Sequence, residues 1–350
     1  MLYIRADGNE KIGTGHVMRC LTIAEEYWRR GGEAVFLVAD PRSYELVNEH
    51  GYRVICLRSV WNDLNTEMDT LIRIIQSNNV ECLLIDSYFV THSYLKALRN
   101  YTKVVYIDDL DCFIYPVDLL INYNIYATDL DYFSRYKESA LNTRFILGCK
   151  YVPLRNEFQN VKRTISRDVR KILITSGGTD NYNVIGNLLE AFSKQTWFAN
   201  VDIYAIIGKF NSNKNELLQH WSTKKNIHFL CGIHNMSAYM KECDLAITAG
   251  GVTTYELCAC GLPSVMYTLA DNQMSIAKKV SDMGLIPYAG DVRNNMEQCV
   301  RSVIEYITDF YNDVNLRIKH SAYMQNVVDG KGCERLVDEI ERMEMLYKEN

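Results

Sequence analysis

Residues 2–40, "LYIRADGNEKIGTGHVMRCLTIAEEYWRRGGEAVFLVAD", contain one complete repeat of the pattern that decides the fold. The apolar runs LYIRAD and AVFLVAD have the length of buried strands. Between them, apolar side chains recur at helical spacing on one face, at Val17, Leu21, Ala24 and Trp28. A strand, a crossover helix and a second strand predict a parallel sheet with helices on its faces.

The same alternation continues along the chain in two series. The runs YRVICL, ECLLIDS, KVVYIDDL and DLLINYN follow first, and after a more polar, irregular segment the runs KILITSGG, VDIYAIIG, IHFLCGI, LAITAGG and PSVMYTL form the second series. We therefore predict an α/β protein with two Rossmann-like, doubly wound parallel-sheet domains that face each other across a cleft. The predicted domains are residues 1–155 and 168–335, followed by a C-terminal helix over 336–350. The pattern leaves open which domain this helix packs on.

The composition excludes several classes of protein. Lys and Arg total 38 against 43 for Asp and Glu, with no run of five like charges, so neither nucleic acid nor an anionic membrane surface is an expected partner. No apolar stretch approaches the roughly 18 residues of a membrane span. The 11 cysteines are scattered without paired CxxC spacing, which argues against zinc and disulfides. We expect a cytoplasmic monomer with no metal and no cofactor.

Two glycine-rich segments of the second domain follow predicted strands and precede predicted helices. Gly177 and Gly178 lie in GGTDN, and Gly251, Thr253 and Thr254 lie in AGGVTTYELCACGLP. Exposed amides at a helix start attract phosphate, so each segment predicts a phosphate cradle. The alternatives are a tight turn without ligand for the first segment and ordinary N-capping by the threonines for the second.

Two further features complete a predicted nucleotide site. Glu256, one turn into the second helix, is placed to accept hydrogen bonds from ribose hydroxyls, although a solvated charge is the simpler interpretation. Ile233 lies in GIHN, residues 232–235, where backbone groups could contact a flat base. Neither GxGxxG nor GxxxxGK[ST] is present, so a nucleoside diphosphate fits these loops better than a dinucleotide or ATP.

These residues carry a resemblance to known families. Residues 250–273, GGVTTYELCACGLPSVMYTLADNQ, resemble the nucleotide-binding signature of GT-B sugar-nucleotide enzymes. Residues 4–27, IRADGNEKIGTGHVMRCLTIAEEY, resemble the signature of the pseudaminic-acid pathway hydrolases, which release UDP from UDP-2,4-diacetamido-2,4,6-trideoxy-β-L-altrose. The motifs IDSY (85–88), YIDDL (106–110), GCKYVPLR (148–155) and DGKGCERL (329–336) extend the resemblance over nearly the whole chain. Two departures are Gly8, where serine is frequent, and Cys149.

The resemblance implies a GT-B-like fold, a UDP-sugar substrate and UDP as product. It also implies roles for individual residues. His16 corresponds to the catalytic histidine, Tyr88 and Asn272 line the sugar and diphosphate pocket, and the nucleotide is held by Gly177, Gly178, Thr253, Thr254 and Glu256.

The chemistry of the implied reaction agrees with a single histidine. Because a diphosphate leaves as a weak base, the main requirement is a base that deprotonates the attacking water, and imidazole has a suitable pKa. Gly13 and Gly15 tolerate backbone angles that would aim His16 at the sugar. Asp7 would stabilise positive charge at C1 or orient His16. The alternative for His16 is a helix-capping residue with a satisfied ring.

Several classes of function remain open at this stage. The first is a metal-independent hydrolase in which water attacks C1 of the sugar with inversion and the C–O bond breaks. The second is a GT-B glycosyltransferase, which shares the nucleotide site but needs an acceptor pocket. A regulatory module that binds a sugar nucleotide and a non-hydrolysing epimerase are the others.

Overall fold

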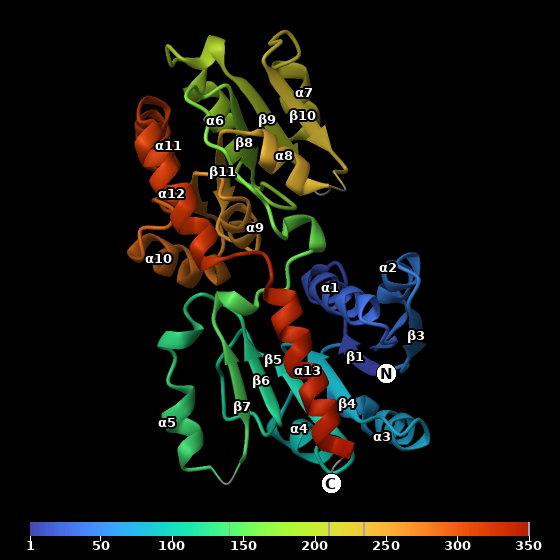
Figure 1. Cartoon of the computed structure of the whole chain (residues 1–350). Coiled ribbons are helices and arrows are strands. Elements are labelled where there is room, and N and C mark those ends of the chain that lie inside the picture. Colours follow the sequence, from blue (N-terminus) through green and yellow to red (C-terminus); the bar gives the residue numbers. More distant parts are fainter. Residues whose placement is uncertain (140, 209–210, 234, 349–350) are drawn as a thin grey trace. The chain divides into compact units, whose positions relative to one another are not determined.

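The computed structural model describes residues 1–139, 141–208, 211–233 and 235–348. The chain forms two compact units, shown in Figure 1. Unit 1 comprises Met1–Arg155 together with Lys331–Asn350, and unit 2 comprises Asn156–Gly330. The second domain was predicted over residues 168–335, whereas unit 2 begins at Asn156 and ends at Gly330. The segment after it returns to unit 1.

Unit 1 is built on a seven-stranded parallel sheet with the order β3-β2-β1-β4-β5-β6-β7. Its central strand β1 pairs with β2 on one side and β4 on the other, so that Ile4 lies opposite Phe36 and Leu84. Helices cover the sheet, which explains why its central strands are continuous apolar runs. The strands are β1 (Leu2–Ala6), β2 (Ala34–Val38), β3 (Arg53–Cys56), β4 (Cys82–Asp86), β5 (Lys103–Ile107), β6 (Leu119–Asn122) and β7 (Arg144–Leu147).

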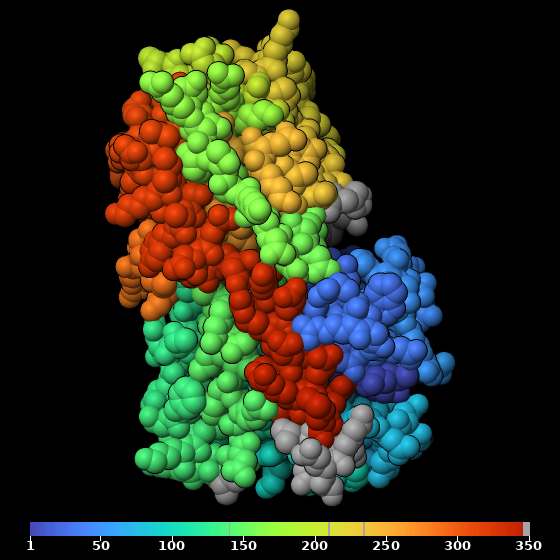
Figure 2. Space-filling view, viewed as in Figure 1, coloured from blue at the N-terminus to red at the C-terminus, as the bar shows by residue number. Residues whose placement is uncertain are grey.

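The last helix of the chain belongs to unit 1, which answers the question that the sequence left open. α13 packs against α1 and against β4 and β5 (Figure 1), and Figure 2 shows it on the surface of unit 1 beside α1. Arg30 of α1 donates to Asp338 and Glu341 of α13. The helices of unit 1 are α1 (Gly15–Arg29), α2 (Tyr44–Glu49), α3 (Met68–Ser77), α4 (His92–Leu98), α5 (Tyr132–Lys137) and α13 (Gly332–Lys348), with short 3₁₀ turns η1 (Pro41–Ser43), η2 (Leu64–Glu67), η3 (Ala127–Asp129) and η4 (Cys149–Tyr151).

Unit 2 repeats this plan with six parallel strands in the order β10-β9-β8-β11-β12-β13. Its strands are β8 (Lys171–Thr175), β9 (Asp202–Ile207), β10 (Ile227–Cys231), β11 (Leu245–Ala249), β12 (Ser264–Thr268) and β13 (Tyr288–Asp291). Its helices are α6 (Val184–Phe192), α7 (Lys214–His220), α8 (Met236–Glu242), α9 (Thr253–Cys260), α10 (Met274–Asp282), α11 (Met296–Asn312) and α12 (Val314–Val327), with 3₁₀ turns η5 (Asn156–Phe158), η6 (Phe198–Asn200) and η7 (Asp271–Gln273).

Three details differ from the sequence prediction. Trp28 is not part of the buried face of α1, because its side chain is 66% exposed while Val17, Leu21 and Ala24 are buried. β7 and β13 were not predicted as strands. Each has only four residues and lies at the edge of its sheet, where partial exposure breaks the apolar run.

The two strand orders indicate where ligands are expected to bind. In unit 1 the order reverses between β1 and β4, and in unit 2 it reverses between β8 and β11. Open parallel sheets bind ligands beyond the carboxyl ends of the strands at such a switch point, because the loops on either side diverge there. Among the described residues, no helix is long and apolar enough to cross a bilayer.

Candidate active site

The loop from β1 to α1 brings His16 to the switch point of unit 1. Asn9 folds the loop back on itself, since its side chain accepts from the amide nitrogens of Lys11 and Ile12 and its own amide donates to the carbonyl of Gly13 at 3.1 Å. Gly13 has φ +71°, a conformation that favours glycine. Gly15 does not need this freedom, because it is simply the first residue of α1. His16 follows it in the first helical turn.

Asp86, the last residue of β4, holds the ring of His16. The Nδ1 atom of His16 lies 2.6 Å from Oδ1 of Asp86, and the two residues are only 5% and 1% exposed. A carboxylate at this distance stabilises the tautomer with the proton on Nδ1, which leaves Nε2 as the basic nitrogen. No described residue forms a hydrogen bond to Nε2. The pair therefore has the arrangement of a general base and the group that orients it.

Arg19, one helical turn after His16, binds the same carboxylate, and its Nη2 atom also lies 3.1 Å from Nδ1 of His16. Its Nε and Nη2 atoms donate to the two oxygens of Asp86, each at 2.5 Å, and its Nη1 lies 2.7 Å from Oδ2 of Asp109. Burial opposes ionisation of Asp86, but the charge of Arg19 and the hydrogen bonds from Arg19 and His16 outweigh it and hold the pKa of Asp86 below its usual range. Asp86 is thus an anion at neutral pH.

Tyr88 covers the imidazole from the solvent side. Its ring meets that of His16 edge-on with 4.3 Å between centroids, and its hydroxyl lies 3.5 Å from Oδ2 of Asp109. Burial, reinforced by Asp109, raises the pKa of Tyr88 to about 12, so its hydroxyl remains a hydrogen-bond donor at neutral pH. The side chain is still 40% exposed, which makes it available to a ligand.

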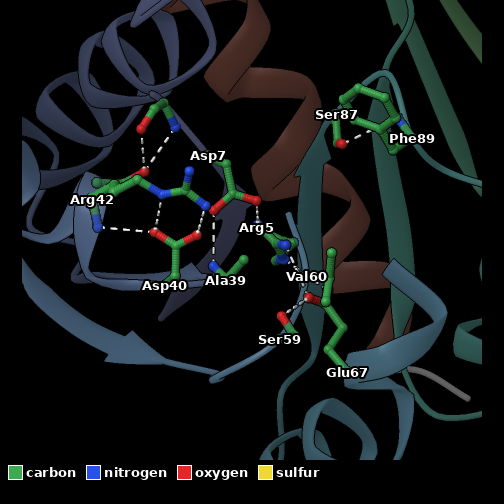
Figure 3. A network of polar contacts seen from close by, with 12 residues as sticks. Arg5, Asp7, Ala39, Asp40, Arg42, Ser59, Val60, Glu67, Ser87 and Phe89 are labelled. Carbon is green, nitrogen blue, oxygen red and sulfur yellow. Dashed lines mark hydrogen bonds and ion pairs between the residues drawn. The ribbon is translucent and has the colours of Figure 1, made fainter. Parts of the chain in front are cut away.

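Asp7 lies in a separate buried network, drawn in Figure 3. Its carboxylate accepts from Arg5 at 2.6 Å and from the amide of Ala39 at 2.8 Å, while Arg5 also binds both oxygens of Glu67. The carboxylate that contacts the His16 ring is therefore Asp86 and not Asp7. Asp86 and Arg19 were not predicted from the sequence, although Asp86 lies in the IDSY motif. The available signal was an acidic residue at the end of the strand that neighbours β1.

The first predicted phosphate loop follows β8 at the switch point of unit 2. Gly177 has φ +80°, and a side chain at Gly178 would meet open space. Gly208, at the end of β9, packs directly beneath this loop: a Cβ atom there would lie 2.4 Å from the carbonyl oxygen of Gly177 and 2.3 Å from that of Gly178. Gly208, which was not predicted from the sequence, thus lets the loop lie close against the neighbouring strand.

The second predicted loop follows β11, the strand next to β8. Gly251 precedes α9, and Thr253, the first residue of that helix, is half-buried. Thr254 is fully buried, and its hydroxyl lies 3.7 Å from the sulfur of Met266 in the core. Only Thr253 of the pair therefore lies at the surface. Glu256 is half-buried in the first turn of α9.

The other predicted residues of unit 2 lie around the same edge of the sheet. Ile233 follows β10 and lines a cavity of about 650 Å³ together with residues of β10 and α8, including Asn235 and Tyr239. His234 lies outside the described residues. Asn272 is exposed in η7, after β12. Tyr88 and Asn272, which were predicted to line one pocket, therefore belong to different units.

A second cavity of about 650 Å³ lies in unit 1 along α1, between Met18 and Trp28, and none of the candidate site residues lines it. Within the described part of the chain, no group of three or more His, Cys, Asp or Glu side chains could hold a metal ion.

Comparisons with known proteins agree with the resemblance seen in the sequence. Residues 172–315, all in unit 2, match the C-terminal domain of glycosyltransferase family 28. The chain is 26% identical to a Methanocaldococcus jannaschii protein over 88% of its length, and spans 66% of that protein. It is 25% identical to the spore coat polysaccharide biosynthesis protein SpsG of Bacillus subtilis over 95% of both chains.

A further relative bears the name of the expected activity. The chain is 25% identical to the UDP-2,4-diacetamido-2,4,6-trideoxy-β-L-altropyranose hydrolase of Campylobacter jejuni, over 72% of this chain and 86% of that one. The crystal structure of Acinetobacter baumannii MurG superimposes with a TM-score of 0.69 at 15% identity and covers 97% of this chain and 99% of that one. The predicted GT-B-like fold is confirmed, and the resemblance to the pseudaminic-acid pathway hydrolases is supported by these relatives.

Proposed function

We propose that the protein hydrolyses a UDP-linked 2,4-diacetamido-2,4,6-trideoxy sugar, releasing UDP in the biosynthesis of pseudaminic acid or a related surface sugar. Water attacks C1 from the face opposite the diphosphate, the bond between C1 and the diphosphate oxygen breaks, and the configuration at C1 inverts. Nε2 of His16 takes the proton of the water, and the electrons of the broken bond leave with UDP. The reaction needs no metal and no cofactor.

The pairing of His16 with Asp86 is the observation that carries this proposal. The contact of 2.6 Å fixes the ring, and the negative charge of Asp86 stabilises the imidazolium that forms when water gives up its proton. Asp86 takes the orienting role that the sequence left open for Asp7. Tyr88, edge-on to the ring and partly exposed, is assigned to the sugar.

Unit 2 is assigned the nucleotide. The first turn of α9 and the glycine loop after β8 offer backbone N–H groups to the diphosphate. Thr253 adds a hydroxyl, Glu256 is assigned the ribose, and Ile233 borders the cavity proposed for the base. Asn272, at the start of the next helix along the same edge, is assigned the diphosphate side of the sugar.

A glycosyltransferase is the second candidate, and the match to glycosyltransferase family 28 in unit 2 favours it. A histidine paired with a carboxylate would deprotonate an acceptor hydroxyl as readily as a water molecule. The two candidates differ in what the enzyme needs in order to release UDP.

The deciding experiment is turnover in ¹⁸O-labelled water without any acceptor. The hydrolase should release UDP, the UDP should contain no label because the phosphorus is not attacked, and NMR should show the inverted anomer as the first sugar product. EDTA should leave the rate unchanged. Release that begins only after an alcohol acceptor is added would establish the transferase, and labelled UDP would exclude attack at C1. A panel of UDP-, CMP- and GDP-linked sugars would test the choice of uridine.

A further inference from the structure

Arg19 is a single cation shared between two carboxylates that lie on different strands of unit 1. Its side chain is only 13% exposed. Besides its two bonds to Asp86 at the end of β4, it contacts Asp109 after β5 at 2.7 Å and donates to the hydroxyl of Tyr123 after β6 at 2.5 Å. One guanidinium therefore ties the start of α1 to the carboxyl ends of three neighbouring strands.

The contact between Arg19 and Asp86 affects the imidazole of His16. Oδ1 of Asp86 accepts from both His16 and Arg19, so the guanidinium fixes the plane in which the carboxylate meets the imidazole. Without Arg19, Asp86 would lose the cation that favours its ionised form, and the side chain would be freer to turn. A neutral or rotated Asp86 no longer selects the proton on Nδ1, and Nε2 loses its basic character in the other tautomer.

Through Asp109, Arg19 also connects His16 and Asp86 to Tyr88, which is partly exposed to solvent. Asp109 also accepts from Asn124 at 3.1 Å, and it lies 3.5 Å from the hydroxyl of Tyr88, whose ring contacts His16. His16, Asp86, Arg19, Asp109 and Tyr88 thus form a closed ring of contacts. A displacement of any member is passed to the imidazole within two contacts.

We propose that Arg19 is a positioning residue that sets the tautomer and direction of the His16 ring by holding Asp86 and Asp109 in place together. This inference rests on the proposed role of His16 as the base. Arg19 contacts the imidazole at Nδ1, 3.1 Å from its Nη2, and not at Nε2, the atom that is proposed to take the proton. A lysine cannot reproduce its effect fully, because one ammonium group lacks the planar fork that binds Asp86 through two nitrogens.

Kinetics of variants at position 19 test the proposal. Arg19→Gln should lower kcat by about 10²-fold, the loss expected from misplacing a catalytic group by about 1 Å, with KM almost unchanged. Arg19→Lys should be intermediate. Arg19→Ala should regain part of its kcat when guanidinium ion is added at concentrations too low to unfold the protein. The matched control is Arg29→Gln on the same helix, where the arginine is exposed and pairs with Glu26; its kinetics should equal those of the wild type.

¹⁵N NMR of histidine-labelled protein gives a readout that does not need turnover. The wild type should show His16 protonated on Nδ1, and Arg19→Gln should show a mixture of tautomers while its thermal unfolding midpoint stays near that of Arg29→Gln. An unchanged tautomer, or a kcat equal to that of Arg29→Gln, would overturn the proposal. Loss of kcat with a lowered midpoint and no guanidinium rescue would also overturn it, because Arg19 would then be structural. If no sugar nucleotide is hydrolysed, the proposed function fails, but the tautomer comparison still decides the role of Arg19.

Discussion

In both units the strand order reverses at the same place, between β1 and β4 in unit 1 and between β8 and β11 in unit 2. The residues that lie at this switch point differ between the two units. In unit 1 the last residue of β4 is Asp86 and the start of α1 supplies His16 and Arg19, so the candidate site consists of ionisable side chains fixed by one another. In unit 2 the loops after β8 and β11 supply glycines and the start of a helix, so the site consists mainly of backbone. The first arrangement is suited to moving a proton, and the second to holding an anion.

The two units also differ in the pKa of a buried carboxylate, Asp86 in unit 1 and Asp180 in unit 2. Asp86 has a cationic partner, and its pKa is lowered despite complete burial. Asp180, in the glycine loop of unit 2, accepts from the amides of Val184 and Ile185 and has no such partner among the described residues. Burial therefore prevails there and raises the pKa of Asp180 to about 6. The fold is common to both positions, and the neighbouring side chains decide the charge.

Substitution of His16 is expected to have the largest effect on catalysis and so to separate the role of unit 1 from that of unit 2. His16→Asn should lower kcat by up to about 10⁴-fold, the upper range for a positioned general base. UDP affinity, measured by calorimetry, should stay close to that of the wild type because the nucleotide loops lie in unit 2. An equal collapse of UDP binding would mean that His16 is structural and that the division of labour is wrong.

Asp86→Asn should have the next largest effect. The imidazole remains, but the amide can turn its N–H toward Nδ1 and stabilise the tautomer that carries its proton on Nε2. We expect kcat to fall by roughly 10²-fold or more, with little change in KM. Asp7→Asn provides the comparison, because Asp7 binds Arg5 and the backbone of Ala39 instead of the histidine. If Asp7→Asn lost more kcat than Asp86→Asn at equal stability, the assignment of the orienting acid would be reversed.

The backbone pattern was predictable from the sequence because both sheets are buried. Runs such as LLID and LAITA have the length and composition of central strands in a covered parallel sheet, and the alternating helices indicate their connections. The edge strand β7, with its exposed Arg144, carries too little of this signal. The return of α13 to unit 1 rests on contacts such as Arg30 with Asp338, whose partners are separated by more than 300 residues. The spacing of apolar residues within one segment carries no information about contacts between segments so far apart in the sequence.

The histidine was predictable, and its partners were not. His16 stands out because Gly13 and Gly15 precede it in the segment that follows a predicted strand. Asp86 and Arg19 become partners only when β4 is placed beside β1, which is a consequence of the strand order. The same limit applies to Thr254. Thr253 and Thr254 look equivalent in the sequence, and the helix direction alone sends one hydroxyl into the core beside Met266.

That pair of threonines gives a smaller, matched test of the backbone site. Thr253→Val removes a surface hydroxyl assigned to the diphosphate and should weaken UDP binding by roughly tenfold, the value of one hydrogen bond to a charged group. Thr254→Val preserves shape in the core and should leave UDP affinity unchanged. Calorimetric titration with UDP measures both. Equal losses would show that the helix start acts as a whole, and the reverse order would place the phosphate on the other side of α9.

The smallest expected effect concerns Asp180 and depends on pH. Its pKa of about 6 in the folded protein exceeds the value near 3.9 of an unfolded chain, so the folded state binds the proton more tightly between these values. The contribution of Asp180 to the free energy of unfolding is therefore most favourable below about pH 4 and is lost as pH rises through about 6. The difference corresponds to on the order of 3 kcal/mol at full titration.

Asp180→Asn removes the titration and keeps an acceptor oxygen for one of the two helix amides, while its NH2 group replaces the oxygen that accepts from the other. Hydrogen exchange of the α6 amides should show wild-type protection rising relative to the variant as pH falls from 7 to 5, because intrinsic exchange rates cancel when both proteins are compared at the same pH. A constant ratio would mean that Asp180 has a stabilising partner, as Asp86 does. The contrast between a paired and an unpaired carboxylate would then disappear, and the two switch points would differ only in their glycines.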